Sequence, residues 1–407
     1  MSKTIVIGAG QAGLAMSWHL TQAGIEHEVL EARDRFGGSW LKRWDSFCLV
    51  TPNWTCNMPG YPYDGADPDG FMPRDELVAY FSRYAASFNP PVRFGVRVTS
   101  VDRLGDGFRL ETTSGPIDAS RVIVAAGGYQ VPKVPAFAAD LPKSVLQLHT
   151  DAYRNEGALP PGAVLVVGSG QSGAQIAEEL HEGGRGVYLS VGSCGSAPRR
   201  YRGHDVFWWI FQVMQHGAEV GVPARTVDRL PDPRARFACN PHLSGKNGGH
   251  EINLRLLGAE GVTLLGHLAA VAGPRIQLSD DLAQNLAAAD RFFDERFRPD
   301  IDRYIEAAGV DAPPADRVPY SFDPPILQHL DLGAAGIGTV IWASGYRLDL
   351  DWVRPADLDE MGYPRHARGV TDVPGLYFLG LPWLYTLGSS ILAGVGADAT
   401  YLAQQMA

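Results

Sequence analysis

Two stretches of the chain repeat the same pattern of hydrophobic and polar positions. The first, IVIGAGQAGLAMSWHL, begins at Ile5, and the second, VLVVGSGQSGAQIAEEL, begins at Val164. In each, a short and mostly β-branched apolar run, typical of a buried strand, is followed by a glycine-rich turn and by apolar residues at helical spacing. The pattern predicts two strand–turn–helix units, and therefore an α/β fold with two nested doubly wound, Rossmann-like domains.

Both turns contain the spacing Gly-x-Gly-x-x-Gly that dinucleotide-binding folds use. The first glycine permits a sharp turn, the second lets a pyrophosphate approach the backbone, and the third allows the helix to pack against the strand. Unpaired N–H groups and the dipole at the start of the helix favour the negatively charged pyrophosphate. The predicted contact residues are Gly8, Gly10, Gln11, Ala12 and Gly13 in the first turn and Gly168, Gly170, Gln171, Ser172 and Gly173 in the second.

The ends of the following strands distinguish two ligands. In the first unit the strand ends at Glu31, whose carboxylate would accept hydrogen bonds from ribose hydroxyls and repel a 2′-phosphate. In the second unit the strand ends at Ser190 without an acid, and Arg199, Arg200 and Arg202 follow. This combination predicts NADPH at the second site, with Ser190, Arg199 and Arg200 as contacts. NADH, and a solvated loop for the arginines, are the alternatives.

Composition excludes several classes of protein. The 407 residues exceed the usual size of one domain, and 45% hydrophobic with 20% charged residues is the balance of a globular protein. A formal net charge of -10 argues against a nucleic-acid-binding surface. No apolar run is long enough to span a membrane, and the N-terminus lacks a secretory signal, so a cytoplasmic location is expected.

The four cysteines, Cys48, Cys56, Cys194 and Cys239, follow no CxxC spacing. This favours four reduced, unpaired thiols over a disulfide framework or a zinc site. The histidines show no ligand spacing either, so no metal is expected. The missing cysteine pair also argues against an NADPH-dependent disulfide reductase, which needs such a pair.

Four further segments match a known family in sequence and in order along the chain. They are RFGGSW with Gly38 and Trp40, AAGGYQVPKVP at 125–135, IWASGYRLD at 341–349, and GLYFLGL at 375–381 with Gly380. They resemble the second flavin-side signature, the paired crossings between domains and the last flavin-contacting strand of the flavin-containing monooxygenases, which are class B flavoprotein monooxygenases. In length and motif order the chain is similar to the bacterial flavoproteins and plant indole-pyruvate monooxygenases of this superfamily.

The family's identifying motif is only partly matched. LQLHTDAYR resembles it through His149 and Tyr153, but its preceding Phe and Gly are replaced by Lys143 and Val145. This departure argues against the Baeyer–Villiger branch. The resemblance implies that His149 positions the junction between the domains; direct proton transfer by this side chain is the alternative.

A second departure lies in the segment TPNW at 51–54. Many members of the family carry Thr-Asn there, and the asparagine touches the reactive edge of the flavin. Here Pro52 takes that place, and Asn53 is the candidate substitute.

The resemblance implies one domain interrupted by another. Residues 1–155 and 335–407 would bind FAD, and residues 156–334 would form an NADPH-binding domain with a helical insertion. It also implies that reduced FAD forms a C4a-hydroperoxide that oxygenates a small organic substrate of the nitrogen, sulfur or keto-acid type. The expected partners are this substrate and molecular oxygen, without nucleic acid or membrane. No catalytic side chain and no oligomeric state follow from the sequence.

Two other functions are alternatives to oxygenation. An NADPH oxidase or flavin redox sensor would release hydrogen peroxide without oxygenating a substrate, and the change at Pro52 keeps that interpretation open. A non-catalytic dinucleotide-binding module would need only the two folds.

The insertion contains a predicted helical run at 281–308, in which apolar residues recur at spacings of three and four. We expect it to pack on the NADPH-binding domain, with a lid over the substrate as the alternative. Trp208 and Trp209 are expected in the core or an interface rather than against a planar substrate.

Overall fold

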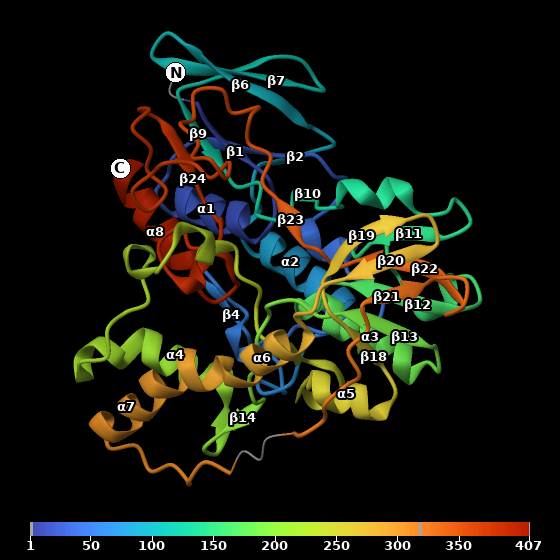
Figure 1. The fold of residues 1–407 in the computed structure, drawn as a ribbon. Helices are drawn as coiled ribbons and strands as arrows, with labels where there is room; N and C mark the ends of the chain where they lie inside the picture. Colours follow the sequence, from blue (N-terminus) through green and yellow to red (C-terminus); the bar gives the residue numbers. More distant parts are fainter. Residues whose placement is uncertain (1–2, 317–319, 407) are drawn as a thin grey trace.

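The core of the structure is a pair of parallel β-sheets (Figure 1). The computed structural model describes residues 3–316 and 320–406. The first sheet has five strands in the order β24-β9-β1-β2-β5. These strands are β1 (Thr4–Ile7), β2 (His27–Glu31), β5 (Val92–Phe94), β9 (Arg121–Val124) and β24 (Leu376–Phe378). The helices of this domain are α1 (Gln11–Gln22), α2 (Arg74–Phe88) and α8 (Val395–Met406).

The strands of the first sheet are apolar because both faces of the sheet are covered. Ile5 and Val6 of β1 have no exposed surface, and α1 packs against both β1 and α8. A parallel sheet buried on both faces needs a continuous apolar run rather than an alternating one. The sequence shows this continuous apolar pattern in the strand before each glycine turn.

The second sheet also has five parallel strands, in the order β11-β22-β12-β13-β18. They are β11 (Leu146–His149), β12 (Ala163–Val167), β13 (Val187–Ser190), β18 (Thr263–Leu265) and β22 (Ile337–Trp342). Helices α3 (Gln171–Glu182) and α5 (Leu254–Glu260) contact its strands β12, β13 and β18. The two sheets confirm the predicted fold of nested Rossmann-like domains.

Two strands from the ranges predicted for the first domain lie in the second sheet. β11 lies within the range 1–155 and β22 within the range 335–407, both predicted for the first domain, yet the two strands pair with each other in the second sheet. The glycine pattern locates only β12, α3 and β13, which form the middle of that sheet. Its outer strands come from chain before and after this unit, where no comparable pattern marks them.

The internal repeat extends beyond the glycine turns. β1, β2, β5 and β9 take the same places in the first sheet as β12, β13, β18 and β22 take in the second. Each unit also carries a three-stranded antiparallel sheet between its third and fourth strands. These are β6 (Val98–Leu104), β7 (Gly107–Thr112) and β8 (Ile117–Ala119), and β19 (Leu268–Ala272), β20 (Arg275–Leu278) and β21 (His329–Asp331). The outermost places are filled by β24, which follows its unit, and by β11, which precedes its own.

The two crossings between the domains run side by side. β10 (Val131–Pro132) pairs in antiparallel fashion with β23 (Tyr346–Arg347). The N–H of Lys133 also donates to the carbonyl oxygen of Gly345 at 2.9 Å. The segments that resemble domain crossings of flavin-containing monooxygenases are therefore hydrogen-bonded to each other.

The insertion consists of three helices, α4 (Val206–His216), α6 (Leu282–Arg296) and α7 (Arg298–Ala308). The predicted helical run is confirmed, with a break at Phe297 because Pro299 in the first turn of α7 cannot continue a preceding helix. Leu286 packs in the core of the second domain, whereas Phe293 packs with the fully buried Trp209 of α4. Only the first part of the run therefore packs on the NADPH-binding domain.

Short strand pairs complete the fold: β3 (Asn57–Met58) with β4 (Tyr61–Pro62), β14 (Arg200–Tyr201) with β15 (His204–Asp205), and β16 (Leu243–Ser244) with β17 (His250–Glu251). Within the two described ranges, no helix combines the length and the apolar character that crossing a membrane requires.

Candidate functional site

The two glycine turns have nearly the same geometry. Gly8 has a φ of +105° and Gly168 a φ of +103°. A Cβ at either position would lie 2.7 Å from a carbonyl oxygen, that of Ala125 for Gly8 and that of Ala343 for Gly168. Both the backbone angle and the space therefore require glycine, and in both domains the neighbouring carbonyl belongs to the start of a crossing segment.

The third glycine of each turn lets the helix pack against the first. A Cβ at Gly13 would lie 1.7 Å from the carbonyl oxygen of Gly8, and a Cβ at Gly173 would lie 1.9 Å from that of Gly168. No side chain fits at either position. The predicted reason for these glycines, close packing of helix on strand, is what the structure shows.

The second glycine of each turn faces open space at the start of a helix. A Cβ at Gly10 would meet nothing within 4 Å, and a Cβ at Gly170 would meet only Cys239, at 3.8 Å. Neither α1 nor α3 has a side-chain cap or an acidic residue in its first turn. The N–H groups there have no competing side-chain anion, as binding of a pyrophosphate requires.

Glu31 lies against the first turn. Its Oε2 accepts a hydrogen bond from the Ala9 N–H at 2.8 Å, and its Oε1 accepts one from the Arg33 N–H at 2.9 Å. These bonds fix a carboxylate that is almost fully buried at the end of β2. Each carboxylate oxygen retains a second lone pair that can accept from a ribose hydroxyl.

The other residues predicted for the first site converge on the same turn. Trp40 Nε1 donates to Gln11 Oε1 at 3.3 Å. A Cβ at Gly38 would lie 3.4 Å from the Cα of Gly10, and a Cβ at Gly380 would lie 2.5 Å from the Cβ of Ala12. Two segments distant in sequence, residues 38–40 and the segment of Gly380, therefore lie against the start of α1.

At the second site, not all of the predicted residues are free to contact a ligand. The turn residues stand together, but the hydroxyl of Ser190 donates to the Gly266 carbonyl oxygen at 3.0 Å and is buried. The imidazole of His267, at the end of β18, lies beside Gly192, just beyond Ser190. No sequence pattern marked His267, because it reaches the end of β13 from the loop that follows the neighbouring strand β18.

Arg199, predicted as a contact of the 2′-phosphate, is bound by groups of the protein itself. Its Nε donates to Asp205 Oδ2 at 2.7 Å, its Nη1 donates to the Val50 carbonyl oxygen at 2.9 Å, and its guanidinium lies over the ring of Phe71. Only 7% of the residue is exposed. The guanidinium holds the insertion against the first domain, and its donors Nε and Nη1 already have partners within the protein.

The two neighbouring arginines differ in their surroundings. Arg202 pairs with Asp302 at 3.1 Å, so it also serves packing. Arg200 is exposed on the β14–β15 hairpin. Successive side chains of a strand point to opposite sides. The sequence pattern did not indicate that a hairpin begins here. Of the predicted phosphate contacts, Arg200 is the one left accessible.

Two cysteines contradict the prediction of four unpaired thiols. Cys194 and Cys239 form a disulfide, with Cα atoms 5.8 Å apart across 45 residues of chain. Cys48 and Cys56 are free, and burial raises the pKa of the Cys56 thiol to about 12. The absence of a cysteine pair therefore no longer argues against disulfide chemistry.

The segment after the disulfide lies along the second turn. His242 is completely buried, and its Nε2–H donates to the Ser169 carbonyl oxygen at 2.5 Å. Burial lowers the pKa of His242 to about 4, so the ring is neutral at physiological pH. Gln171 and Gln175 of α3 donate to the carbonyl oxygens of Pro241 and Leu243.

His149 and Tyr153 join the crossing to the second domain. The His149 ring lies 3.1 Å from both Asp151 Oδ1 and the Gly345 carbonyl oxygen. The hydroxyl of Tyr153 donates to Glu179 Oε1 of α3 at 2.9 Å. These contacts suit a positioning role at the domain junction, because both ring nitrogens of His149 face fixed protein partners.

Asn53 carries an unused acceptor. Its Nδ2 donates to the Asp67 carbonyl oxygen at 2.9 Å, while its buried Oδ1 has no partner in the described part of the chain. A buried acceptor without a donor is costly. It therefore fits a donor on a bound group, as a flavin ring would provide. Nearby, Trp54 packs edge-on against Phe211 of α4 at 5.3 Å, which brings the insertion over this segment.

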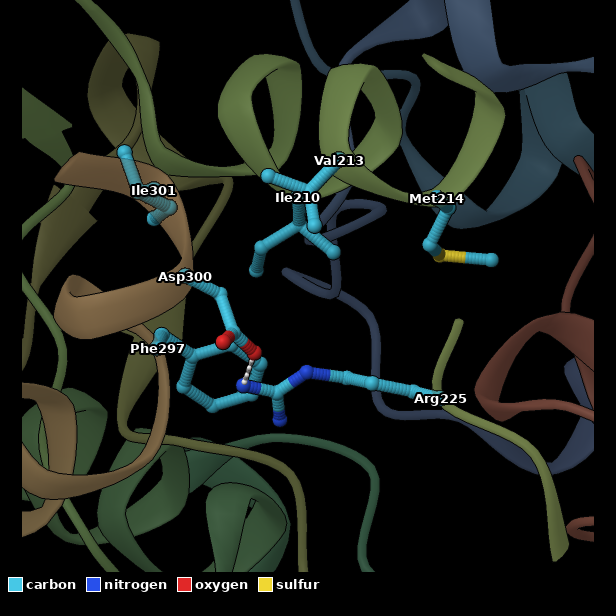
Figure 2. Close-up of a pocket in the computed structure, with 7 residues that line it drawn as sticks. All are labelled: Ile210, Val213, Met214, Arg225, Phe297, Asp300 and Ile301. Carbon is cyan, nitrogen blue, oxygen red and sulfur yellow. Dashed lines mark hydrogen bonds and ion pairs between the residues drawn. The ribbon is translucent and has the colours of Figure 1, made fainter. Parts of the chain in front are cut away.

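A hollow between α4 and α7 is separate from these turns. Figure 2 shows Arg225 reaching Asp300 beneath Ile210 and Val213 of α4. The Arg225–Asp300 distance is 2.7 Å, so the charge is already matched within the insertion. The hollow belongs to the packing of the insertion. Over the described ranges no three His, Cys, Asp or Glu side chains are grouped to hold a metal ion.

Comparisons with known proteins agree with two dinucleotide sites. The family described as pyridine nucleotide-disulphide oxidoreductase matches residues 5–209. The chain is 34% identical over 400 residues to an uncharacterized CzcO-like oxidoreductase of Geobacillus kaustophilus, covering 98% of this chain and 96% of that protein. It is 30% identical over 231 residues to the indole-3-pyruvate monooxygenase YUCCA1 of Oryza sativa subsp. japonica, covering 56% and 55% of the two chains. The flavin-containing monooxygenase from Stenotrophomonas maltophilia superposes with a TM-score of 0.64 at 20% identity, covering 100% of this chain and 98% of that one.

Proposed function

The chain belongs to the pyridine nucleotide-disulphide oxidoreductase family, as an FAD-dependent oxidoreductase of the flavin-containing monooxygenase type, and on that premise we propose that it oxygenates a small organic molecule with FAD and NADPH. The observation that carries the proposal is the matched pair of open glycine turns, each beside the start of a crossing segment. The crossing segments that begin beside the two turns are joined to each other by the pairing of β10 with β23.

The residues of the first domain would bind and orient FAD. The N–H groups at the start of α1 would hold its pyrophosphate, and Glu31 would accept from its ribose hydroxyls. Asn53 Oδ1 supplies a hydrogen-bond acceptor for a ring N–H. When bound, FAD accepts hydride from NADPH and, once reduced, activates oxygen for transfer to the substrate.

The residues of the second domain would hold NADPH at the start of α3. With Arg199 engaged elsewhere, the side chains left for the 2′-phosphate are the exposed Arg200 and the imidazole of His267. His267 Nδ1 contacts Asp281 Oδ2 at 2.5 Å, which holds the ring with its Nε2 on the side of Gly192. NADPH is therefore the proposed coenzyme, with NADH as the competitor to be measured.

The insertion would exclude water from the reacting groups. Its helix α4 contacts Trp54 beside Asn53, and the N–H of Val227, beyond α4, donates to the Tyr385 carbonyl oxygen of the first domain at 2.8 Å. An oxygenating enzyme needs such shielding because water promotes loss of the activated oxygen as hydrogen peroxide.

The test is rapid mixing of NADPH-reduced, FAD-loaded protein with oxygenated buffer in the absence of substrate. A flavin absorbance band that persists and differs from both oxidised and reduced FAD would support a monooxygenase awaiting its substrate. A screen of amines, sulfides and keto acids would follow, with oxygenated product as the readout. Immediate return to oxidised FAD with stoichiometric hydrogen peroxide would instead identify an oxidase or redox sensor.

A further inference from the structure

The second glycine turn is covered by a short piece of chain, residues 238–243, here named the strap. The strap is held along the turn by three hydrogen bonds: from Gln171 Nε2 to the Pro241 carbonyl oxygen at 3.2 Å, from Gln175 Nε2 to that of Leu243 at 2.8 Å, and between His242 Nε2 and that of Ser169 at 2.5 Å. The first turn has no corresponding disulfide-bonded cover.

The Cys194–Cys239 disulfide fastens one end of the strap. Cys194 is buried in the loop after β13, whereas Cys239 is exposed. A Cβ at Gly170 would lie 3.8 Å from the Cβ of Cys239, while a Cβ at Gly10 would meet no atom within 4 Å. The two turns otherwise match, so the presence of Cys239 beside Gly170 is the feature that distinguishes the second turn. The disulfide places Cys239 where the backbone of Gly170 is left open for a pyrophosphate.

We propose that Cys194 and Cys239 form a thiol–disulfide exchange site that controls entry of the nicotinamide dinucleotide at the second turn. The oxidised pair holds the strap over Gly170, and the reduced pair releases it. This inference rests on the proposed function only in taking the second turn as the NADPH site.

Cys239 is the sulfur that reacts with external partners in the reduced state. It is exposed, and it lies at the N-terminus of α3, where the helix dipole stabilises a thiolate. Cys194, with its Sγ 3.0 Å from the Asn240 carbonyl oxygen, stays in place as the resolving thiol. The pair thus combines one accessible nucleophile with one buried partner.

The disulfide can be reduced by a dithiol and formed again by hydrogen peroxide. A dithiol reduces the pair: its thiolate attacks Cys239, breaks the S–S bond and forms a mixed disulfide, and its second thiolate then displaces Cys239, so two electrons pass to the protein. Hydrogen peroxide reverses this. The Cys239 thiolate attacks one peroxide oxygen and hydroxide leaves, and Cys194 then displaces a second hydroxide from the sulfenic acid, so two waters result after protonation.

The chain leading into the strap also takes part in a contact between the domains. The chain leading into the strap touches the first domain through Arg236, which pairs with Asp359 at 3.3 Å. The disulfide ties the same piece of chain to the loop after β13 of the second domain. Reduction therefore removes the covalent attachment and leaves the Arg236–Asp359 pair and the three hydrogen bonds of the strap.

The experiment measures binding of NADP⁺ to the full, FAD-loaded chain by calorimetry in two redox states. One sample is oxidised with diamide and the other is reduced with dithiothreitol, both are freed of reagent, and free thiols are counted in each. We expect two more free thiols after reduction and a Kd for NADP⁺ lower by about tenfold, an ordinary coupling between two sites. In Cys239→Ser the Kd should equal that of the reduced wild type in both states.

Cys48→Ser is the matched control, since Cys48 is a free, half-buried thiol, and it should respond to redox state as the wild type does. Equal Kd values in the two wild-type states would overturn the proposal, as would four free thiols after diamide treatment. Absence of NADP⁺ binding in every state would be a different result, because it would remove the second turn as a nicotinamide site and with it the proposed function.

Discussion

Gly13 lies so close to Gly8 that a Cβ on Gly13 would stand 1.7 Å from the carbonyl oxygen of Gly8. The helix that would present its N–H groups to FAD is therefore seated directly on the turn that precedes it. Gly173 and Gly168 repeat this contact at 1.9 Å. Because the same contact occurs twice in one chain, each site serves as the control for the other.

Gly13→Val is expected to abolish FAD retention, since the added side chain forces α1 off the turn at a cost of about 1–3 kcal/mol or more. FAD content per chain after purification is the measurement. Gly173→Val should retain FAD and lose NADP⁺ binding. A fully flavinated Gly13→Val protein would show that the first turn is not the FAD site.

Gly10→Ala separates ligand contact from folding. Gly10 has an ordinary extended backbone, with φ of -77°, and space for a methyl group. We expect the Tm of the FAD-free protein to stay unchanged while the Kd for FAD rises, because the methyl group occupies the path of the pyrophosphate. A fall in Tm without loss of FAD affinity would contradict this account.

Arg199→Ala is expected to destabilise the fold by about 3 kcal/mol or more, because it leaves the Asp205 carboxylate without its buried partner. The preference for NADPH over NADH should stay the same in the protein that folds. Urea unfolding and kcat/KM with each coenzyme are the measurements. Arg200→Ala is the matched control: its stability should be that of the wild type, and its preference for NADPH should fall. A selective loss with NADPH in Arg199→Ala would restore the role first predicted from the sequence.

Stability is expected to fall in mild acid because of His242. The pKa of about 4 in the folded chain lies below the ordinary value of 6.5, so the unfolded chain takes up the proton first as the pH falls. The stabilising contribution is present above about pH 6.5 and is lost toward pH 4, with an upper bound of roughly 3 kcal/mol. Urea unfolding at pH 7 and pH 5 should show a smaller pH effect in His242→Asn than in the wild type. His216→Asn, at an exposed histidine, is the matched control.

Asn53→Ala is expected to retain FAD and to waste more NADPH. The substitution removes the buried Oδ1 acceptor beside the insertion, so reduced flavin should return to the oxidised state faster and release more hydrogen peroxide per NADPH. Peroxide and NADPH are measured in the same reaction. An unchanged ratio, with FAD content also unchanged, would place Asn53 outside the flavin site.

The features that could be predicted from the sequence are those that depend on residues close together in the chain. Each glycine turn, its strand and its helix lie within about twenty residues, so residue spacing alone determines the geometry at Gly8 and Gly168. Arg199 could not be placed in this way, because the β14–β15 hairpin decides which arginine faces Asp205 and which faces solvent. The Cys194–Cys239 pair was missed for a similar reason, since the cysteines are separated by 45 positions that include α4 and the chain that returns to the second turn.

The sheet that β11 joins could not be predicted for a third reason. A strand at the edge of a sheet has little sequence signal of its own, and β11 was assigned to the domain that precedes it in the chain. The hydrophobic pattern predicts that such a strand exists but not which sheet it joins.

The outer strands also set the order in which the protein can be completed on the ribosome. β11, the outer strand of the second sheet, is synthesised before the rest of that sheet, so the second domain can close as soon as β22 emerges. The first sheet receives β24 only after every strand of the second sheet has been made, and until then β9 is an unpaired edge. Although its residues are made first, the FAD-binding domain is therefore the last to finish, and its open edge is where a nascent chain would most need protection from aggregation.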